Sequence, residues 1–239
     1  MSRAPEHPAD FERKVLECWH DSATHWQQLI DQDSVASRII TSPAIEQAVL
    51  SYQPSRVLDV GCGEGWLARK LAKRGFQVTG VDAVESLVNA ARAQDPHSHY
   101  LCLEYDALPG PLADCQFDLA VCNFSLFGDQ SVQRLVTTLL DLLPAHGHLL
   151  IQTLHPLSAC QGDYREGWRN SQWQGLNEHG QQLGEAPPWF FRSLAGWLTL
   201  LQQSGRLVHM QEPLDPETRL PLSALFHVQP VRQQDRNKP

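Results

Sequence analysis

Three glycines at alternate positions follow a run of apolar residues in the stretch RVLDVGCGEGW, residues 56–66. Gly61, Gly63 and Gly65 have no side chain, so the backbone can turn sharply here and lie close to a bound molecule. Glycines clustered between a strand and a helix are typical of nucleotide-binding loops. The residues therefore predict a site for a ligand that contains a nucleoside.

Two common nucleotide loops fit this stretch poorly. The dinucleotide fingerprint has glycine at its first, third and sixth positions, and the sixth position counted from Gly61 is the bulky Trp66. A nicotinamide or flavin site is therefore disfavoured. The phosphate-binding P-loop requires Gly-Lys followed by Ser or Thr, and no such sequence follows the glycines.

Acidic or amide side chains stand near the ends of four successive apolar runs. Asp59 precedes the glycines, Asp82 ends FQVTGVD, Asp106 ends HYLCLEYD, and Asn123 follows FDLAVC. A single acid in such a place is as readily a helix cap or a turn residue. Four of these residues in succession indicate a binding site, because the carboxyl ends of parallel strands share one edge of a sheet.

The elements that must position these residues alternate between strands and helices. We expect an α/β fold, a Rossmann-like doubly wound sheet of about seven mostly parallel strands with helices on both faces. Apolar runs predict strands at 56–60, 76–82, 99–106, 117–124, 147–154, 206–211 and 224–228, and helical spacing predicts helices at 66–75, 83–94, 129–143 and 189–205.

Two flanking regions break this alternation. Residues 1–50 predict an N-terminal helical cap segment, in which Ser42 caps a helix that has Pro43 at its first position. Residues 155–190 form a long polar and aromatic insertion after the fifth strand, and a connection of that length predicts a functional segment, here a substrate lid. Residues 51–239, including this insertion, are expected to form one domain.

The stretch VLDVGCGEGWLARKLAKRG, residues 57–75, resembles the first motif of the class I S-adenosylmethionine-dependent methyltransferases, and the likeness covers about residues 50–155. The segment CNFSLF, residues 122–127, lacks the Asn- or Asp-Pro-Pro-aromatic motif of the amino methyltransferases and the Pro-Cys nucleophile of the cytosine-C5 enzymes. It looks more like the small-molecule, methyltransferase type 11-like branch. The resemblance implies that S-adenosylmethionine is the cofactor and that S-adenosylhomocysteine is the product.

The resemblance also implies roles for the strand ends. Asp59 is expected to take the ammonium group of the cofactor, Asp82 the ribose hydroxyls and Asp106 the adenine amino group. The implied cofactor-binding residues are Asp59, Gly61, Cys62, Gly63, Gly65, Asp82, Ala83, Asp106, Ala107, Asn123, Phe124 and Ser125, with Arg38 on the cofactor carboxylate.

The flanking regions must then hold the methyl acceptor. His155 directly follows the fifth strand, and we expect it to be a general base or a substrate hydrogen-bond partner, with a histidine bonded to backbone as the alternative. Tyr164 and Trp168 are expected to form an aromatic wall. Arg192, on the helix after the insertion, is expected to hold an acidic substrate, and Trp26 to act as a lid residue.

Composition limits the class of partner. The 239 residues carry a formal net charge of -8, which disfavours a protein that mainly binds nucleic-acid phosphates. No stretch approaches the roughly 20 apolar residues of a membrane span, and the six cysteines show no CxxC pattern. We expect a reduced, cytoplasmic, metal-free enzyme with a small-molecule substrate. The alternatives are an RNA methyltransferase and a non-catalytic cofactor-binding protein that activates a partner.

Overall fold

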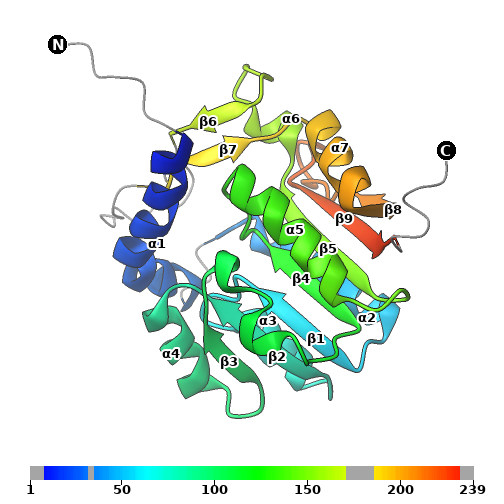
Figure 1. The fold of residues 1–239 in the computed structure, drawn as a ribbon. Helices are drawn as coiled ribbons and strands as arrows, with labels where there is room; N and C mark the ends of the chain where they lie inside the picture. The colour runs from blue at the N-terminus through cyan, green and yellow to red at the C-terminus, as the bar shows by residue number, and fades with distance from the viewer. Residues whose placement is uncertain (1–7, 32–34, 171–185, 232–239) are drawn as a thin grey trace.

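The computed structural model describes residues 8–31, 35–170 and 186–231 (Figure 1). Its strands are β1 (Arg56–Val60), β2 (Gln77–Asp82), β3 (His99–Cys102), β4 (Leu119–Asn123), β5 (His148–Leu154), β6 (Gly167–Arg169), β7 (Trp189–Phe191), β8 (Gly205–Gln211) and β9 (Ser223–Pro230). Its helices are α1 (Pro8–Asp31), α2 (Arg38–Tyr52), α3 (Trp66–Ala72), α4 (Glu85–Gln94), α5 (Gln130–Leu142), α6 (Pro156–Ala159) and α7 (Leu194–Ser204), with 3-10 turns η1 (Tyr105–Ala107) and η2 (Gly110–Leu112).

Seven of the strands form one sheet in the order β3-β2-β1-β4-β5-β9-β8. The first five strands are parallel, and β9 runs antiparallel to both of its neighbours, β5 and β8. The order reverses between β1 and β4, and in such sheets ligands bind outside the carboxyl ends of the strands at that point. The predicted fold class is confirmed.

Helices cover both faces of this sheet, because side chains alternate between the faces along each strand. Val57 and Leu150 lie in one apolar cluster with residues of α2, α3 and α4. Leu58 and Ile151 lie in a second cluster with residues of α5 and α7. In Figure 1, α5 and α7 lie in front of the sheet, and α2 lies behind it.

Two predicted helix starts are wrong. Residues 189–191 form strand β7, paired with β6, and the helix begins only at Leu194, because Ser193 caps it by accepting a hydrogen bond from the Gly196 N–H. At the N-terminal side, α2 begins at Arg38 and not at Pro43. Pro43 therefore lies inside the helix, where it lacks the N–H that would bond the carbonyl of Ile39. Ile39 is 77% exposed, so water can satisfy that carbonyl.

Helix α1 and the hairpin β6–β7 lie side by side at the carboxyl-end edge of the sheet (Figure 1). The Phe11 ring of α1 stacks on the Trp168 ring of β6, with centroids 5.1 Å apart. The N-terminal cap and the insertion, predicted separately, therefore meet. Residues 171–185 of the predicted lid lie outside the described residues. In the part of the chain that the structure describes, no helix has the length and apolar character needed to cross a membrane.

Candidate functional site

The glycine loop follows β1 and is attached to the end of β2. The backbone N–H groups of Gly61 and Cys62 both donate to the carbonyl of Val81, at 2.8 and 3.0 Å. Gly61, Gly63 and Gly65 all have positive φ angles, between +55° and +78°, which L side chains rarely adopt. The sequence therefore needs glycine at these three positions for the loop to turn.

Two of these glycines face different surroundings. A Cβ atom on Gly61 would lie 2.3 Å from the Cβ of Ser125, so this glycine allows the loop to pack against the segment after β4. A Cβ atom on Gly63 would meet no heavy atom within 4 Å. Open space therefore lies directly over Gly63, where a ligand could approach the backbone.

Asp59 and Asn123 bring two unpaired acceptors to this edge. Asp59 is 2% exposed, and its Oδ2 has no hydrogen-bond partner. The Oδ1 of Asn123 is buried without a partner as well. Strands β1 and β4 are neighbours, with Val60 paired to Cys122. A ligand that binds here must supply hydrogen-bond donors, because buried acceptors without partners are costly.

Burial raises the pKa of Asp59 to about 8, and the negative charges of Glu64 and Asp82 add to this rise. A backbone hydrogen bond from Ala68 lowers the pKa in part. Near neutral pH the ligand-free carboxyl group is therefore mostly protonated. A cation beside Asp59 would reverse this shift, because opposite charge favours the ionised form.

Asp82 links β2 to the glycine loop. Its Oδ2 accepts from the Gly63 N–H and its Oδ1 from the Val84 N–H, both at 2.9 Å. Burial raises the pKa of Asp82 although these backbone hydrogen bonds lower it. Each carboxylate oxygen can accept a second hydrogen bond, so Asp82 can hold the loop and a ligand hydroxyl together. Ala83 lies between Asp82 and Val84, beside the same edge.

Asp106 lies elsewhere than the sequence predicts. Strand β3 ends at Cys102, and Asp106 sits with Ala107 in the 3-10 turn η1. Its carboxylate is 68% exposed and accepts from Arg134 of α5, with both of its oxygens 3.1 Å from the Arg134 Nη2. The prediction that Asp106 ends a strand is wrong. Its role toward adenine stays a prediction.

The segment after β4 turns sharply toward the loop. Phe124 has a φ angle of +53° and donates its N–H to the Gln152 carbonyl. The Ser125 hydroxyl donates to the Val60 carbonyl at 2.7 Å, and the Tyr105 hydroxyl donates to the Ser125 carbonyl at the same distance. These bonds fix Asn123 and its neighbours against β1. Cys62 is buried beside them, which raises the pKa of its thiol.

Arg38 and Trp26 approach the loop from the N-terminal helices. The Arg38 guanidinium lies 4.6 Å from the ring centroid of Trp66, the residue that follows Gly65. The ring of Trp26 packs edge-on against Trp19, in a cluster with Val84 at the end of β2. Both predicted residues therefore lie near the edge that carries the loop, while their contacts with a ligand stay predictions.

His155 is 4% exposed and both of its ring nitrogens have partners. Its Nδ1 accepts from the Leu157 N–H at 3.2 Å, and its Nε2 lies 2.8 Å from the Glu212 Oε1. The acceptor role of Nδ1 places the ring proton on Nε2, which donates to Glu212. These contacts match the alternative of a histidine bonded to backbone. A general-base role, which stays a prediction, would require one of the bonds to break.

Arg192 is held by the protein itself. It lies between β7 and α7, not on a helix, so its predicted position is wrong. Its guanidinium donates to the Gly128 carbonyl, the Asp129 carbonyl and the Asp129 Oδ1, at 2.7 to 2.9 Å. Burial lowers the pKa of Arg192, and the charge of Asp129 opposes that. An acidic substrate would have to compete with these partners.

Tyr164 and Trp168 lie on the hairpin side of the cap. The Tyr164 ring packs edge-on against Phe191, and its hydroxyl accepts from the Leu194 N–H. Trp168 packs between Phe11 and Phe190, and its indole Nε1 is buried with no hydrogen-bond partner. Trp168 thus offers a donor that a ligand oxygen could satisfy.

The sequence interpretation missed two buried or bridging carboxylates. Glu64, inside the glycine loop, is 1% exposed and lies 3.7 Å from Arg69. Glu12 of α1 accepts from the N–H groups of Asp129 and Gln130 and from the Ser131 hydroxyl. Glu64 could have been singled out because it lies within the loop sequence GCGEG. Glu12 has no such local signal, because its partners lie more than a hundred residues away.

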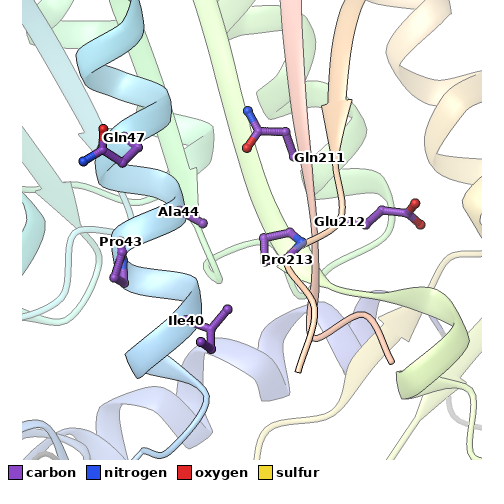
Figure 2. A pocket seen from close by; sticks show the side chains of 7 residues that line it. All are labelled: Ile40, Pro43, Ala44, Gln47, Gln211, Glu212 and Pro213. Atoms are coloured by element: carbon purple, nitrogen blue, oxygen red, sulfur yellow. The ribbon is translucent and has the colours of Figure 1, made fainter. Parts of the chain in front are cut away.

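A cavity of about 360 Å³ lies between α2 and the end of β8 (Figure 2). Ile40 and Ala44 line it from α2, and Gln211, Glu212 and Pro213 line it from the other side. Strand β8 is the edge strand, separated from β1 by β9, β5 and β4. This groove is therefore not part of the glycine-loop site. In the described ranges no three His, Cys, Asp or Glu residues are grouped to hold a metal ion.

Comparisons with known sequences agree with this geometry. Residues 37–205 match the family model described as a methyltransferase domain. A malonyl-[acyl-carrier protein] O-methyltransferase of Enterobacter lignolyticus is 35% identical over 162 residues, which are 68% of this chain and 61% of that protein. A ubiquinone biosynthesis O-methyltransferase of Coxiella burnetii is 36% identical over 116 residues, 46% of this chain and 48% of that protein. The matched region thus spans about half to three fifths of these curated relatives.

Solved structures share the fold. The 1,6-didemethyltoxoflavin-N1-methyltransferase of Burkholderia thailandensis, with S-adenosylhomocysteine bound, aligns with a TM-score of 0.68 over 97% of this chain and 94% of that chain, at 18% identity. An S-adenosylmethionine-dependent methyltransferase of Mesorhizobium loti aligns with a TM-score of 0.60 over 77% of this chain and 96% of that chain, at 26% identity. The family match covers well over half of the sequence, and the glycine loop and the sheet order lie within it. The chain belongs to the methyltransferase-domain family.

Proposed function

We propose that this chain is an S-adenosylmethionine-dependent methyltransferase that methylates an oxygen atom of a small molecule. The observations that carry the proposal are two buried, unpartnered acceptors on neighbouring strands, Asp59 Oδ2 and Asn123 Oδ1, and the open space over Gly63 in the loop that follows β1. An ammonium group brings three N–H donors and a positive charge. The two acceptors lack hydrogen-bond donors, and Asp59 lacks a positive charge beside it.

The charge of the loop separates this cofactor from phosphate-bearing nucleotides. Glu64 and Asp82 lie close enough to Asp59 to raise its pKa. A pyrophosphate placed over Gly63 would add negative charge to this group of carboxyls, which like-charge repulsion disfavours. S-adenosylmethionine instead brings an ammonium and a sulfonium group against one carboxylate, so its net charge is positive.

The residues of the site can each take a defined part. When bound, S-adenosylmethionine supplies a methyl group that an acceptor oxygen takes by in-line displacement, leaving S-adenosylhomocysteine. Asp59 and Asn123 would bind the ammonium group, and Asp82 would accept from the ribose hydroxyls while it keeps the loop in place. Arg38 would reach the cofactor carboxylate from α2. Holding the reacting atoms in line accounts for much of the rate that such a site can provide.

Two observations support an oxygen acceptor on a small molecule. Two of the relatives are named O-methyltransferases. On the cap side, the buried indole N–H of Trp168 has no partner and can donate to an oxygen of the acceptor. The rings of Phe11 and Phe190 pack against Trp168 and would contribute apolar contact with the carbon skeleton.

Binding and transfer test the proposal in two steps. Calorimetry should show that S-adenosylmethionine and S-adenosylhomocysteine bind, whereas NAD and ATP do not. Trideuteromethyl-labelled cofactor is then incubated with the protein and a metabolite extract, and mass spectrometric fragmentation should place the label on an oxygen atom of a small molecule. Preferential binding of NAD would contradict the cofactor assignment. Label that appears only in added RNA would favour the RNA methyltransferase alternative.

A further inference from the structure

Asp59 and Glu64 form a pair of buried carboxyls at the heart of the glycine loop. Their residues are 2% and 1% exposed. Carboxyl groups this well buried are rare unless they are paired with a cation or carry a specific role. Glu64 is not needed for the turn of the loop, which the glycines on either side of it make possible. The turn of the loop alone therefore does not explain why these two carboxyls are buried.

The charges around the pair are unevenly distributed. The guanidinium of Arg69, on α3, donates to the Glu64 backbone carbonyl and lies 3.7 Å from the Glu64 Oε1. Among the described residues, no ion pair joins Asp59 to a cation, and its Oδ2 lacks any hydrogen-bond partner. Arg69 thus favours a negative charge on Glu64, while the proton is left for Asp59.

The other groups that face Asp59 do not neutralise it. Asp82 approaches from the end of β2, Cys62 from the loop and Cys122 from β4, and the electrostatic influence of Asp59 on both thiols is to raise their pKa. Helix α3 contributes the backbone N–H of Ala68. One weaker positive influence, that of His20, acts on Asp82. The two charged side chains that act on Asp59, Glu64 and Asp82, therefore both oppose its ionisation.

We propose that Glu64 is a positioning residue of the cofactor site, whose negative charge adds to burial in keeping a proton on Asp59 until the ammonium group of S-adenosylmethionine displaces it. The inference rests on the cofactor site proposed above. The displaced proton passes from the Asp59 carboxyl to the buffer, and no bond to the cofactor forms or breaks. The carboxylate that results faces the ammonium group, and Glu64 stays paired with Arg69.

We therefore expect the number of protons exchanged with the buffer on binding of S-adenosylmethionine to change sign with pH, from release at low pH to uptake at high pH. The free α-amino group has a pKa of about 7.7–8.0, and burial with the nearby charge of Glu64 raises the pKa of Asp59 to about 8. Below pH 7 the ammonium meets a protonated Asp59, and a proton leaves. Above pH 9 a neutral amine meets an ionised Asp59, and a proton is taken up. The count should cross zero near pH 8.

Calorimetry in pairs of buffers that differ in ionisation enthalpy measures this count directly. At pH 6.5 the native protein should release about 0.9 proton for each S-adenosylmethionine or S-adenosylhomocysteine bound. It should release none with 5′-methylthioadenosine, which has the adenosine but no amino-acid end. The association constant for S-adenosylmethionine should rise roughly tenfold between pH 6 and pH 7.

The Glu64→Gln variant tests the part assigned to Glu64. It keeps the size of the side chain and removes the charge, so the number of protons released at pH 6.5 should fall below that of the native protein. Glu85→Gln, on the exposed surface of α4, is the matched control and should leave the count unchanged. A Glu64→Gln protein that folds and binds S-adenosylmethionine with an unchanged number of released protons would overturn the proposal.

If the Glu64→Gln variant does not fold, calorimetry on the native protein still tests the inference. Tight binding of S-adenosylmethionine at pH 6.5 with no dependence on the buffer, or equal proton release with 5′-methylthioadenosine, would overturn the inference and leave the proposed function intact. If S-adenosylmethionine does not bind at any pH, the proposed cofactor site itself is wrong, and the inference falls with it.

Discussion

Two regions hold their buried polar groups in opposite ways: the cofactor edge, at the carboxyl ends of β1, β2 and β4, and the cap, where α1 and the segment after β7 meet the start of α5. At the glycine loop, Asp59 and Asn123 each leave an acceptor without a partner. In the cap, Arg192 is surrounded by three acceptors from residues 128 and 129, and Glu12 accepts from the first N–H groups of α5. Both regions contain buried charged groups, but among the described residues Asp59 has no ion-pair partner, whereas Arg192 is paired with Asp129.

The difference shows where a ligand is expected. A buried group without a partner destabilises the protein unless something else supplies the missing hydrogen bond. A fully bonded network stabilises the arrangement that it holds. Substitutions at the loop should therefore change binding more than stability, and substitutions in the cap should change stability more than binding.

The largest effect is expected for Gly63→Val. Its Cβ would enter the open space over the loop, where no atom lies within 4 Å, so the protein should fold and show no measurable binding of S-adenosylmethionine. The φ angle of +55° adds a strain of about 1–2 kcal/mol to the folded state. Calorimetry together with urea unfolding separates the two effects.

Gly75→Val is the matched control for this prediction. Gly75 also has a positive φ angle and open space around its Cβ position, but it lies at the end of α3, away from the strand ends. The control should lose similar stability and keep its cofactor affinity. Equal affinity in both variants would remove the loop from the site.

In the cap, Arg192→Met should lower the free energy of unfolding by about 3 kcal/mol. The variant leaves Asp129 and the Gly128 carbonyl without their buried donor. Urea unfolding measures the loss, and the affinity of the folded protein for S-adenosylmethionine should change little. The control Arg165→Met removes an ion pair at an 89% exposed side chain and should have almost no effect. A large loss of affinity in Arg192→Met would merge the two regions into one site.

Asp59→Asn should separate stability from binding at a single residue. The folded protein holds the pKa of Asp59 at about 8, above its ordinary value of 3.8, so the favourable contribution of this group is complete below pH 4 and is lost as the pH rises toward 8. The variant should therefore be more stable than the native chain at pH 8, and this advantage should shrink toward pH 5. Its affinity for S-adenosylmethionine should fall by about 2 kcal/mol.

Urea unfolding at pH 5 and at pH 8 checks this sign, with Asp114→Asn as a control at an exposed position. An Asp59→Asn protein that is less stable than the native chain at pH 8 would show that Asp59 has counter-charge in the folded state. The loop would then resemble the cap, and the contrast between the two regions would disappear.

The cofactor edge could be predicted from the sequence because its signals are local. Each of its signals, the run RVLDV, the glycines and Asp82, lies within a few residues of the glycine loop or of a strand end beside it. The fold class and the family could therefore be predicted, and both are confirmed. The cap depends on distant pairings. Residues 189–191 read as the start of a helix, yet they pair with residues 167–169 as a strand.

The same reason explains the errors at single residues. Asp106 accepts from Arg134, and its local sequence contains no sign of that partner. Glu12 and Arg192 meet around residues 128–131 only because α1, α5 and β7 converge there. Glu64 differs, because it lies within the motif itself, and only its burial beside Asp59 separates it from an ordinary loop residue.

The smallest effect is expected for His155, which belongs to neither region's polar network. Its ring bonds the Leu157 N–H and the carboxylate of Glu212, a residue 51% exposed at the side chain beside the groove of Figure 2. His155→Asn keeps a side-chain acceptor near the Leu157 N–H, since asparagine is a good N-cap residue. Stability should fall by about 1 kcal/mol, through the lost bond to Glu212.

The turnover rate, kcat, shows whether His155 takes part in catalysis or only stabilises the turn after β5. Once an acceptor is identified, a general base would lose about 10²–10⁴-fold in kcat on substitution, and the acid limb of the pH profile would move. One ring nitrogen of His155 is bonded to the Leu157 N–H and the other to Glu212, so neither has a free lone pair to take a proton from the acceptor. We therefore expect kcat to change less than about tenfold and the pH profile to stay where it is. Glu212→Gln separates the two readings. If His155 acts as a base oriented by Glu212, both variants should lower kcat and shift the profile together, whereas with a structural His155 both should change stability alone.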